Sequence, residues 1–300
     1  MELIVHQSIS DLYQSLDLPV TQDLEFTVHS LSEIHDALPF RSPIFRADYF
    51  SFVFVKCGQG AYTLDEQEFK FQERTLYFTN PGHIKSFFIE ACDDAYIVTL
   101  TESFLRENVH PDIFGEFPFL LAETVPPIQL SEADFSEFET LYLQLYREFN
   151  QLSHFKSKIL SSLFVVLLLK IKEQFWNTYD PIAEGDGNSR IVRAFQQRLE
   201  EHFTGLTELG HEHVWQVQDY AHDLHLHPNY FTQVIKAKTG RSAHQWIADR
   251  MVSSAKALLK STDLSAKEIG FRLGFAEATH FSRFFKKQAG LTPGAYRRSH

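Results

Sequence analysis

Two patterns of hydrophobic and polar positions follow one another in the first 177 residues. Between about residues 44 and 105, short runs rich in Val, Phe and Tyr alternate with turn residues such as Asn80-Pro81-Gly82. Many short strands without helices between them predict an antiparallel sandwich or barrel. After residue 131 the apolar residues recur every three or four positions, which predicts helices at about 131–152 and 155–177.

The first predicted helix places large apolar side chains along one side, like the seam of a coiled coil. The members of this seam are Phe135, Phe138, Tyr142, Leu145, Phe149 and Leu152. The second predicted helix is apolar on nearly every side from Leu163 to Leu169, so another surface must cover it. Two interpretations stay open: the helices pack only on the barrel, or they form a dimer interface.

The last third of the chain contains an internal repeat, with an offset of 49 residues before its central turn and 50 after it. The shared positions are Tyr220, Ala221, Leu224, Leu226, Phe231, Ile235 and Gly240 in the first copy, and Ile269, Gly270, Leu273, Phe275, Phe281, Phe285 and Gly290 in the second. Each copy predicts a helix, a tight turn and a second helix ended by a C-cap glycine. The expected bounds of the copies are about 214–239 and 265–289.

Local signals for helix starts agree with the repeat. Pro228 suits the first position of a helix, and Ser265 with Glu268 forms a capping box. A second such box, Ser242-Ala-His-Gln245, opens one continuous helix that we expect to reach Lys260 and to join the two copies.

The residues of both copies resemble a known family. The run from Ala221 to Gly240, and the run from Glu268 through Phe281-Ser-Arg-Phe-Phe-Lys286 to Arg297, look like the AraC/XylS family of bacterial transcription regulators. Gly270 departs from this pattern, since the family more often has alanine there. The resemblance implies two domains. The first is an N-terminal all-β cupin-like jelly roll followed by two helices, and the second is a C-terminal all-α domain with two helix-turn-helix motifs joined by a linker helix.

The patterns and the resemblance together give the expected domain boundaries. Residues 1–177 would form a regulatory and dimerisation domain, with its barrel at about 20–120. Residues 178–188 would be a flexible linker, and residues 189–300 would form the DNA-binding domain. The family also favours the dimer interpretation of the seam. The dimer contacts expected on this basis are Phe135, Phe138, Tyr142, Leu145 and Phe149.

The charge of the chain is distributed unevenly. From Ser189 onward there are sixteen Lys and Arg against ten Asp and Glu, a net charge of +6. The preceding residues carry −17, so the two parts together account for the −11 of the whole chain. A basic end on an acidic protein is the charge distribution expected of a DNA-binding domain joined to a domain that avoids DNA.

The second helix of each copy is the expected recognition helix, at Pro228–Lys238 and Ala276–Gln288. We expect the two to enter successive major-groove segments on one face of the DNA, about 34 Å apart. By the resemblance, the base contacts come from Asn229, Thr232, Gln233, Thr279 and Arg283. The expected phosphate contacts, which position the protein without reading sequence, come from Lys236, Lys286 and Lys287.

The sequence offers little for catalysis. Metal-dependent cupins share a His-x-His pair followed by a glutamate and a later histidine, whereas the barrel region here has His83 with no second histidine nearby. One imidazole is too few ligands for a transition metal, so we expect no metal, cofactor or catalytic residue. Five further histidines are interpreted as polar residues of turns and connections: His211, His213, His222, His225 and His227. Cys57 and Cys92 are interpreted as core thiols.

These observations predict a cytoplasmic transcription regulator, and the family favours an activator. Its expected partners are double-stranded promoter DNA, a second copy of the chain, RNA polymerase and a small-molecule effector. We expect no membrane contact, because the start of the chain lacks a signal peptide and the longest apolar run is too short to span a bilayer. Three alternatives stay open: a cupin enzyme with a DNA-binding tail, an architectural DNA binder indifferent to sequence, and a regulator driven by a partner protein.

Overall fold

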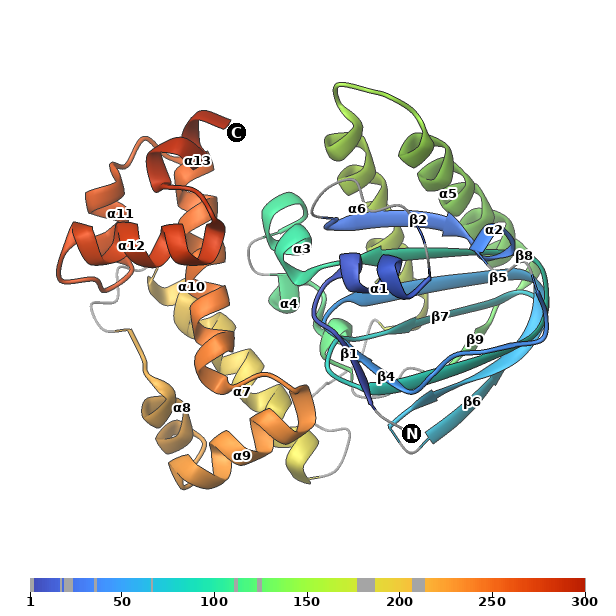
Figure 1. Cartoon of the computed structure of the whole chain (residues 1–300), viewed down its shortest axis with the longest axis horizontal. Coiled ribbons are helices and arrows are strands. Elements are labelled where there is room, and N and C mark those ends of the chain that lie inside the picture. Colours follow the sequence, from blue (N-terminus) through green and yellow to red (C-terminus); the bar gives the residue numbers. More distant parts are fainter. Residues whose placement is uncertain are drawn as a thin grey trace. The chain divides into compact units, whose positions relative to one another are not determined.

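The computed structural model describes residues 3–16, 18, 24–34, 37–65, 67–110, 113–122, 126–176, 187–206 and 214–299. The chain divides into two compact units, a unit with the β-strands and an all-helical unit (Figure 1). The first comprises Met1–Val109 and Ala122–Asp180, and the second comprises His110–Leu121 and Pro181–His300. The expected bounds of the barrel, about 20–120, differ from these units at one place: the segment His110–Leu121 groups with the helical unit. Residues 178–186 of the expected linker lie outside the described residues.

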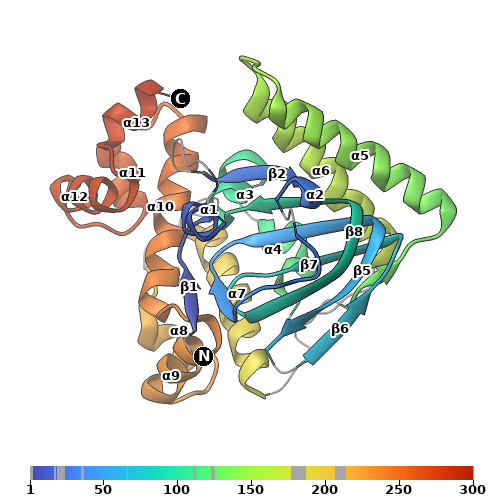
Figure 2. The same ribbon diagram turned by 45° about the vertical axis from the view of Figure 1, so that its right-hand side comes forward.

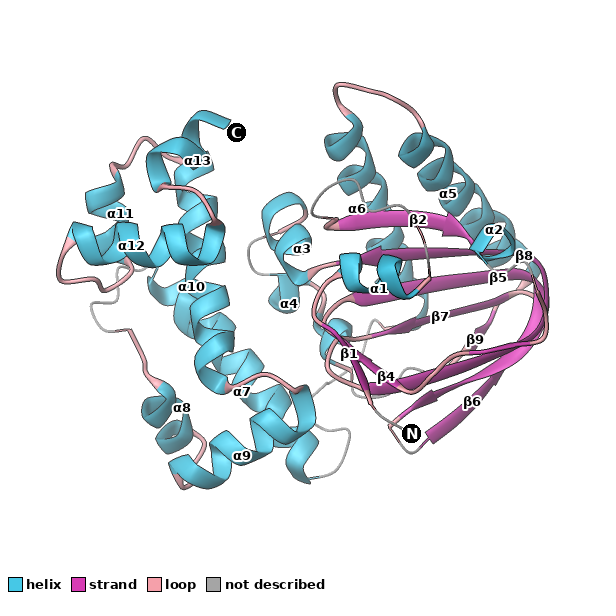
Figure 3. Ribbon diagram, in the orientation of Figure 1, coloured by secondary structure: helices cyan, strands magenta, loops and turns pink. Residues whose placement is uncertain are grey.

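The first unit contains a strongly curved, mainly antiparallel sheet, drawn in magenta in Figure 3. Its strands are β1 (Ile4–His6), β2 (Phe26–Ser30), β3 (Phe40–Arg41), β4 (Phe45–Ala47), β5 (Phe50–Leu64), β6 (Gln67–Phe71), β7 (Thr75–Thr79), β8 (Ile84–Leu100) and β9 (Ile128–Gln129). The helices of this unit are α1 (Ile9–Ser15), α2 (Leu31–Ile34), α3 (Glu102–Asn108), α5 (Glu132–Asn150) and α6 (Lys156–Phe175). The predicted β-rich region and the two predicted helices are therefore confirmed.

The two longest strands, β5 and β8, pair antiparallel from one end to the other, with Phe50 opposite Leu100 and Leu64 opposite Lys85. The register shifts between Val55 and Gly60, where the strand bends. A side chain at Gly60 would overlap the carbonyl oxygen of Phe88 on β8. Glycine at this position therefore allows the two strands to stay in contact through the bend.

Alternate residues of β5 face two different environments, as the period of a strand requires. Val53 and Val55 belong to a buried cluster on the concave side of the sheet. Phe52 and Phe54 face the other way, toward α5 and α6, which lie side by side in Figures 1 and 2. The Phe54 ring stacks on Tyr142 of α5, with 5.0 Å between ring centroids.

This packing corrects the prediction for the seam of α5. Phe138, Tyr142 and Leu145 are each 0% exposed, and they are covered within the unit itself. These three residues therefore cannot line an exposed dimer interface, and that assignment was wrong. The spacing correctly indicated one apolar face, but it carried no information about the surface that covers the face. Phe135 and Phe149 also have partners in this unit: Phe135 packs on Phe54, and Phe149 packs on His29. Leu152, the last member of the seam, is exposed.

The second helix, α6, also turns one side inward, with Leu160, Phe164, Leu167, Leu168 and Ile171 buried. Its outer side keeps two large apolar residues in solvent, Val166 at 41% and Leu169 at 46% exposure. Phe155, just before the helix, is exposed as well. Within the described part of the chain, no helix has the length and apolar character needed to cross a membrane.

The second unit is helical. It contains α4 (Ile113–Glu116), the 3-10 helix η1 (Pro118–Leu121), α7 (Gly187–Thr204), α8 (Val217–Asp223), α9 (Pro228–Thr239), α10 (Ala243–Ser261), α11 (Ala266–Arg272), α12 (Ala278–Ala289) and α13 (Pro293–Ser299). The predicted starts at Pro228, Ser242 and Ser265 are confirmed: proline is in the first turn of α9, and both serines form capping boxes. The predicted connecting helix corresponds to α10.

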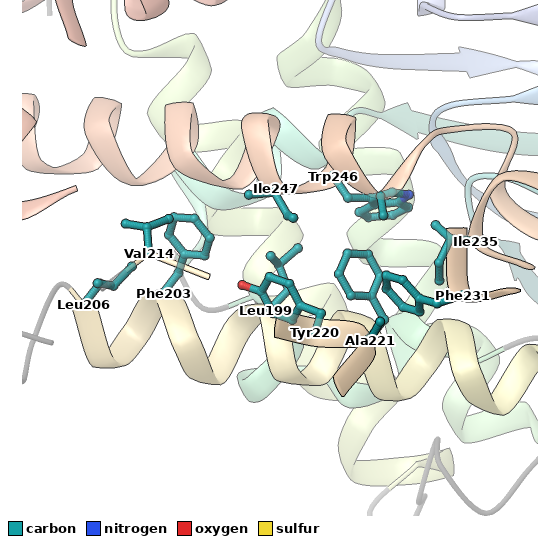
Figure 4. Close-up of a cluster of buried hydrophobic side chains, with 12 residues drawn as sticks. Leu199, Phe203, Leu206, Val214, Tyr220, Ala221, Phe231, Ile235, Trp246 and Ile247 are labelled. Atoms are coloured by element: carbon teal, nitrogen blue, oxygen red, sulfur yellow. The ribbon is translucent and has the colours of Figure 1, made fainter. Parts of the chain in front are cut away.

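Two hydrophobic clusters fill this unit, one for each copy of the repeat. The first surrounds Tyr220, Phe231 and Ile235, and it includes side chains from α7 and from the start of α10 (Figure 4). The second contains Ile269, Leu273, Phe281, Phe285 and Tyr296, together with Ala255, Leu258 and Leu259 from the end of α10. Because α10 contributes to both clusters, it fixes the two helix pairs relative to each other.

Candidate nucleic-acid interface

Each copy of the repeat folds as two helices joined by a tight turn. In the first copy α8 precedes α9, and in the second α11 precedes α12. The turn passes through a left-handed residue in both copies: His225, with φ of 55°, and Gly274, with φ of 76°. The second helix ends in both copies at a left-handed glycine, Gly240 or Gly290, as the repeat predicted.

The first helix of each pair approaches the second closely through a small residue. Ala221 of α8 and Gly270 of α11 are both buried. A Cβ atom on Gly270 would lie 2.9 Å from Cβ and 3.1 Å from Cγ of Phe281. The departure at Gly270 therefore has a physical reason, since Phe281 of α12 occupies the space that an alanine methyl group would need.

The predicted contact residues of α9 lie on its outer face. Phe231, Val234 and Ile235 are buried. The residues that face the other way are Asn229, Gln233 and Lys236, which are exposed, and Thr232, which is half-buried. This face combines amide, hydroxyl and ammonium groups, which are the donors and acceptors that protein–DNA interfaces use for bases and phosphates.

The outer face of α12 is more basic. Phe281 and Phe285 are buried, whereas Thr279, Arg283, Lys286 and Lys287 are exposed. Among the residues that the structure describes, no carboxylate forms an ion pair with Arg283, Lys286 or Lys287. Their positive charges are thus available to an external anion. Thr279 Oγ1 donates a hydrogen bond of 3.1 Å to Glu277 Oε2, which tethers its hydroxyl group at the start of the helix.

Two further exposed side chains on these helices were missed by the sequence analysis. Tyr230 of α9 is 47% exposed, and its hydroxyl donates a hydrogen bond of 3.0 Å to Asn188 Oδ1 at the start of α7. His280 of α12 is exposed next to Thr279. Their neighbours Asn229 and Thr279 had been assigned to the outer face, so the same helical spacing would have indicated both residues.

Polar contacts, one of them buried, hold α9 against α10. The indole Nε1 of Trp246 donates to Thr239 Oγ1 at 3.2 Å, and Thr239 is the last residue of α9. The Arg241 guanidinium lies 4.5 Å from the centroid of the Trp246 ring and also pairs with Asp249. Such contacts fix the direction in which α9 leaves the core, and therefore where its outer face points.

A buried ion pair joins α7 to α10 near the centre of the unit. Arg250 Nε lies 3.0 Å from Glu200 Oε2, and both side chains are about 5% exposed or less. The Arg250 guanidinium also lies 5.3 Å from the centroid of the Phe203 ring. At the C-terminal end of α10, Arg297 donates to the carbonyl oxygens of Leu259 and Thr262, both at 3.0 Å. Arg297 thereby satisfies carbonyl groups that the helix end leaves free.

Of the five histidines interpreted as residues of turns and connections, two have such a place, whereas His222 lies within α8. His227 Nδ1 accepts a hydrogen bond from the Asn229 backbone N–H at the start of α9, and His225 occupies the left-handed turn. His83 in the first unit pairs with Asp65. The predictions for His211 and His213 fall outside the described residues. Among the described residues, no group of three or more His, Cys, Asp and Glu side chains is arranged to hold a metal ion.

The chain is similar in sequence to known helix-turn-helix proteins. A family model described as a helix-turn-helix domain matches residues 220–299. The chain is 23% identical to the uncharacterized HTH-type transcriptional regulator YfiF of Bacillus subtilis (strain 168), over 92% of this chain and 84% of that protein. It is 22% identical to the HTH-type transcriptional activator RhaR of Yersinia pestis bv. Antiqua (strain Angola), over 69% of this chain and 74% of that protein. The solved C-terminal domain of AraT, a response regulator from Geobacillus stearothermophilus, is 30% identical, with a TM-score of 0.33 over 38% of this chain and 89% of that chain.

Proposed function

The chain belongs to the AraC/XylS family of DNA-binding transcription regulators, and we propose that α9 and α12 are the recognition helices of twin helix-turn-helix motifs. Both helices read one DNA site, in adjacent major-groove segments on the same face of the duplex. A single rigid helix, α10, contributes side chains to both hydrophobic clusters, which supports a fixed spacing between the two helices. Proteins that read DNA with two recognition helices on one face place them about one helical turn apart.

The observation that supports this proposal most is the chemistry of the outer faces. The eight predicted contact residues all lie opposite the buried apolar residues of their helix, and none of them is fully buried. On α12 three cations stand together without carboxylate partners among the described residues. Phosphate groups are the anions that such a surface meets on a DNA duplex.

Within α12 we assign different roles to Arg283 and Lys286. Arginine presents a rigid fork that matches O6 and N7 of guanine together, so Arg283 is the proposed base contact. Lys286 lies almost one turn further along and is the proposed phosphate contact. Arg283→Ala should weaken binding to the specific site by about ten- to a hundredfold and leave binding to random DNA nearly unchanged.

Lys286→Ala should instead weaken binding to both duplexes about equally. It should also reduce the slope of log affinity against log salt by about one unit. Both variants are measured by fluorescence anisotropy on both duplexes over a salt series, with Lys70→Ala in the first unit as the control for loss of a positive charge. If Arg283→Ala weakens binding to the specific and the random duplex to the same extent, the proposed division of roles between Arg283 and Lys286 is wrong.

We propose that the first unit is a cupin-like jelly-roll domain that regulates the second. A small molecule bound to the curved sheet would change the affinity for the promoter, with RNA polymerase as the partner at that promoter. The name of the relative RhaR, a transcriptional activator, supports activation as the outcome. Transcription from a reporter promoter, with and without the protein, tests the direction: a fall in transcript on adding the protein would contradict activation.

We propose that a second copy of the chain covers the outer side of α6. The apolar residues Phe155, Val166 and Leu169 are exposed there, whereas Phe138, Tyr142 and Leu145 of α5 are already covered within the unit. Replacing Val166 and Leu169 together with Glu should lower the mass in solution to that of a monomer, as measured by light scattering. An equal mass for the parent and the variant would contradict this interface. The matched control replaces Ser136 and Gln144, two exposed polar residues of α5, with Glu.

A further inference from the structure

The concave side of the sheet in the first unit encloses a cavity of about 110 Å³. Its walls come from β2, β5, β7 and β8 and from the short helices α1 and α2, all labelled in Figure 1. A water molecule needs roughly 10–15 Å³ of such space, so the cavity has room for about seven to eleven groups of that size. This is enough for a small organic molecule.

The walls of the cavity are mostly apolar. Val53, Val55 and Leu64 line it together with Tyr62 and Tyr77, whose rings stack with 4.3 Å between centroids. These five residues are all less than 10% exposed. An apolar group that enters this space loses contact with water and gains contact with close-packed side chains, which is how ligand pockets obtain most of their affinity.

One charged side chain interrupts these walls. Lys85 of β8 lines the cavity and is 5% exposed, and its Nζ donates a hydrogen bond of 3.0 Å to Thr79 Oγ1 on β7. No Asp or Glu occurs among the described residues that line the cavity, and Lys85 forms no ion pair with any described residue. An ammonium group has three N–H donors, so this hydrogen bond leaves two of them to other acceptors.

The buried environment of the Lys85 ammonium group favours a bound anion. Burial lowers the pKa of Lys85 to about 7, although Asp65 and Asp48 act in the opposite direction from outside the cavity. The positive charge is therefore costly where it stands. A carboxylate placed at Nζ would stabilise the charged form and would itself receive charge-assisted hydrogen bonds.

We propose that this cavity binds an amphipathic monocarboxylic acid of about ten non-hydrogen atoms, with its apolar body against Val53, Val55 and Tyr77 and its carboxylate on Lys85 Nζ. Thr79 takes part as well, because its Oγ1 accepts from Lys85 and its hydroxyl hydrogen remains free to donate to the carboxylate. The claim that this ligand is the effector rests on the regulatory function proposed above for the first unit.

The composition of the walls selects against other ligand classes. A sugar would need a hydrogen-bonding partner for each of several hydroxyl groups. Although Ser and Thr residues occur in the lining, polar atoms make up only a small part of the wall surface that a ligand would meet. A phosphate ester would bring nearly two negative charges to a site that has one lysine. A neutral alcohol of the same length would fill the apolar space but would leave the Lys85 ammonium without an anion.

The test compares octanoate with octan-1-ol in calorimetric titrations of the full chain at pH 7. The two probes share their apolar chain, so the difference between them isolates the carboxylate. The parent protein should bind octanoate about ten- to a hundredfold more tightly than octanol. Lys85→Met, which keeps the length and the apolar stem of the side chain, should abolish this preference while still binding octanol. Binding of octanol also shows that the variant has kept its cavity.

Lys70→Met, on the exposed side of β6, is the matched control and should behave as the parent does. Thr79→Val should weaken the binding of octanoate by a smaller factor than Lys85→Met does. Two results would overturn the proposal: octanoate that does not bind more tightly than octanol, or octanoate affinity that is the same in the parent and in Lys85→Met.

Affinity for promoter DNA, measured on the same samples with and without octanoate, separates this inference from the proposed function. Octanoate that binds through Lys85 without changing DNA affinity would support the ligand class and refute effector control by this ligand. Specific DNA binding together with no saturable binding of octanoate would refute the ligand class and leave the DNA-reading function intact.

Discussion

Gly274 lies in the turn between α11 and α12, so its replacement should disturb the position of a recognition helix. Its φ of 76° is in the left-handed region, which costs an alanine about 1–2 kcal/mol. In addition, a Cβ at this position would overlap Val214 Cγ2 and lie 3.2 Å from Val214 Cβ. Val214 is itself buried, so it has little room to move, and overpacking of this kind costs about 1–3 kcal/mol. Gly274→Ala should therefore destabilise the second unit by about 2–5 kcal/mol in all.

Gly290 provides the matched control. Its φ of 74° is nearly the same, but no atom lies within 4 Å of the position that its Cβ would take. Gly290→Ala should therefore cost only the backbone term of about 1–2 kcal/mol. Urea unfolding followed by tryptophan fluorescence measures both variants, since Trp215 and Trp246 belong to this unit.

The contribution of the clash can be isolated by adding Val214→Ala. The smaller side chain at position 214 should recover part of the loss in Gly274→Ala and none of the loss in Gly290→Ala, a coupling that a double-mutant cycle measures. Equal losses of stability in the two glycine variants would refute the close approach of Val214 to this turn, and with it the reasoning from the structure.

Four other predictions follow from the packing and the charges. The pKa of Lys85 is about 7 in the folded state, below its unfolded value of 10.5, so the folded state binds fewer protons between these two pH values. The stability that this group contributes is therefore present above pH 10.5 and is lost as the pH falls to 7. Lys85→Met should remove this pH dependence of the melting temperature and raise the melting temperature at pH 7. Glu200→Gln should cost about 3–5 kcal/mol in urea unfolding because it removes the carboxylate beside the buried Arg250, whereas replacing both residues with Met should cost much less. Tyr142→Ala should lower the thermal stability of the first unit by about 3–5 kcal/mol, because the ring is fully buried against the sheet; a folded, stable variant with only its mass changed would instead favour a dimer contact. The fragment from Ser189 onward, with its charge of +6, should bind random DNA more tightly than the whole chain at low salt, and the difference should shrink as salt is added.

Much of the second unit could be predicted because its signals are local. Capping boxes, proline in a first turn and glycine at a C-cap act within a few residues, so each can be recognised along the sequence. The left-handed conformation of His225 was not foreseen, since a non-glycine residue adopts it only where the surrounding fold requires it. Its counterpart in the repeat, Gly274, was the one available signal.

The first unit was predicted less completely because its arrangement depends on contacts between distant residues. The apolar face of α5 was evident from its spacing, but Phe54 precedes its partner Tyr142 by 88 residues, and an equally apolar face can pack against a second chain. Lys85 is one of several charged residues in the β-rich region, and no sequence pattern indicates that the sheet curves around it. The grouping of α4 and η1 with the helical unit also depends on tertiary contacts, with α7 in the case of α4.

The central claim is that α9 and α12 read one DNA site together. It is tested most directly by a missing-base interference experiment on the genomic site that the full chain binds most tightly. This measurement identifies every base whose loss weakens binding. Two recognition helices on one rigid unit predict two clusters of such bases, centred roughly ten base pairs apart on one face of the duplex. Arg283→Ala should remove interference at the base that Arg283 contacts, within one cluster, and leave the other cluster unchanged. A single cluster, or two clusters on opposite faces of the duplex, would contradict the claim that α9 and α12 read DNA together.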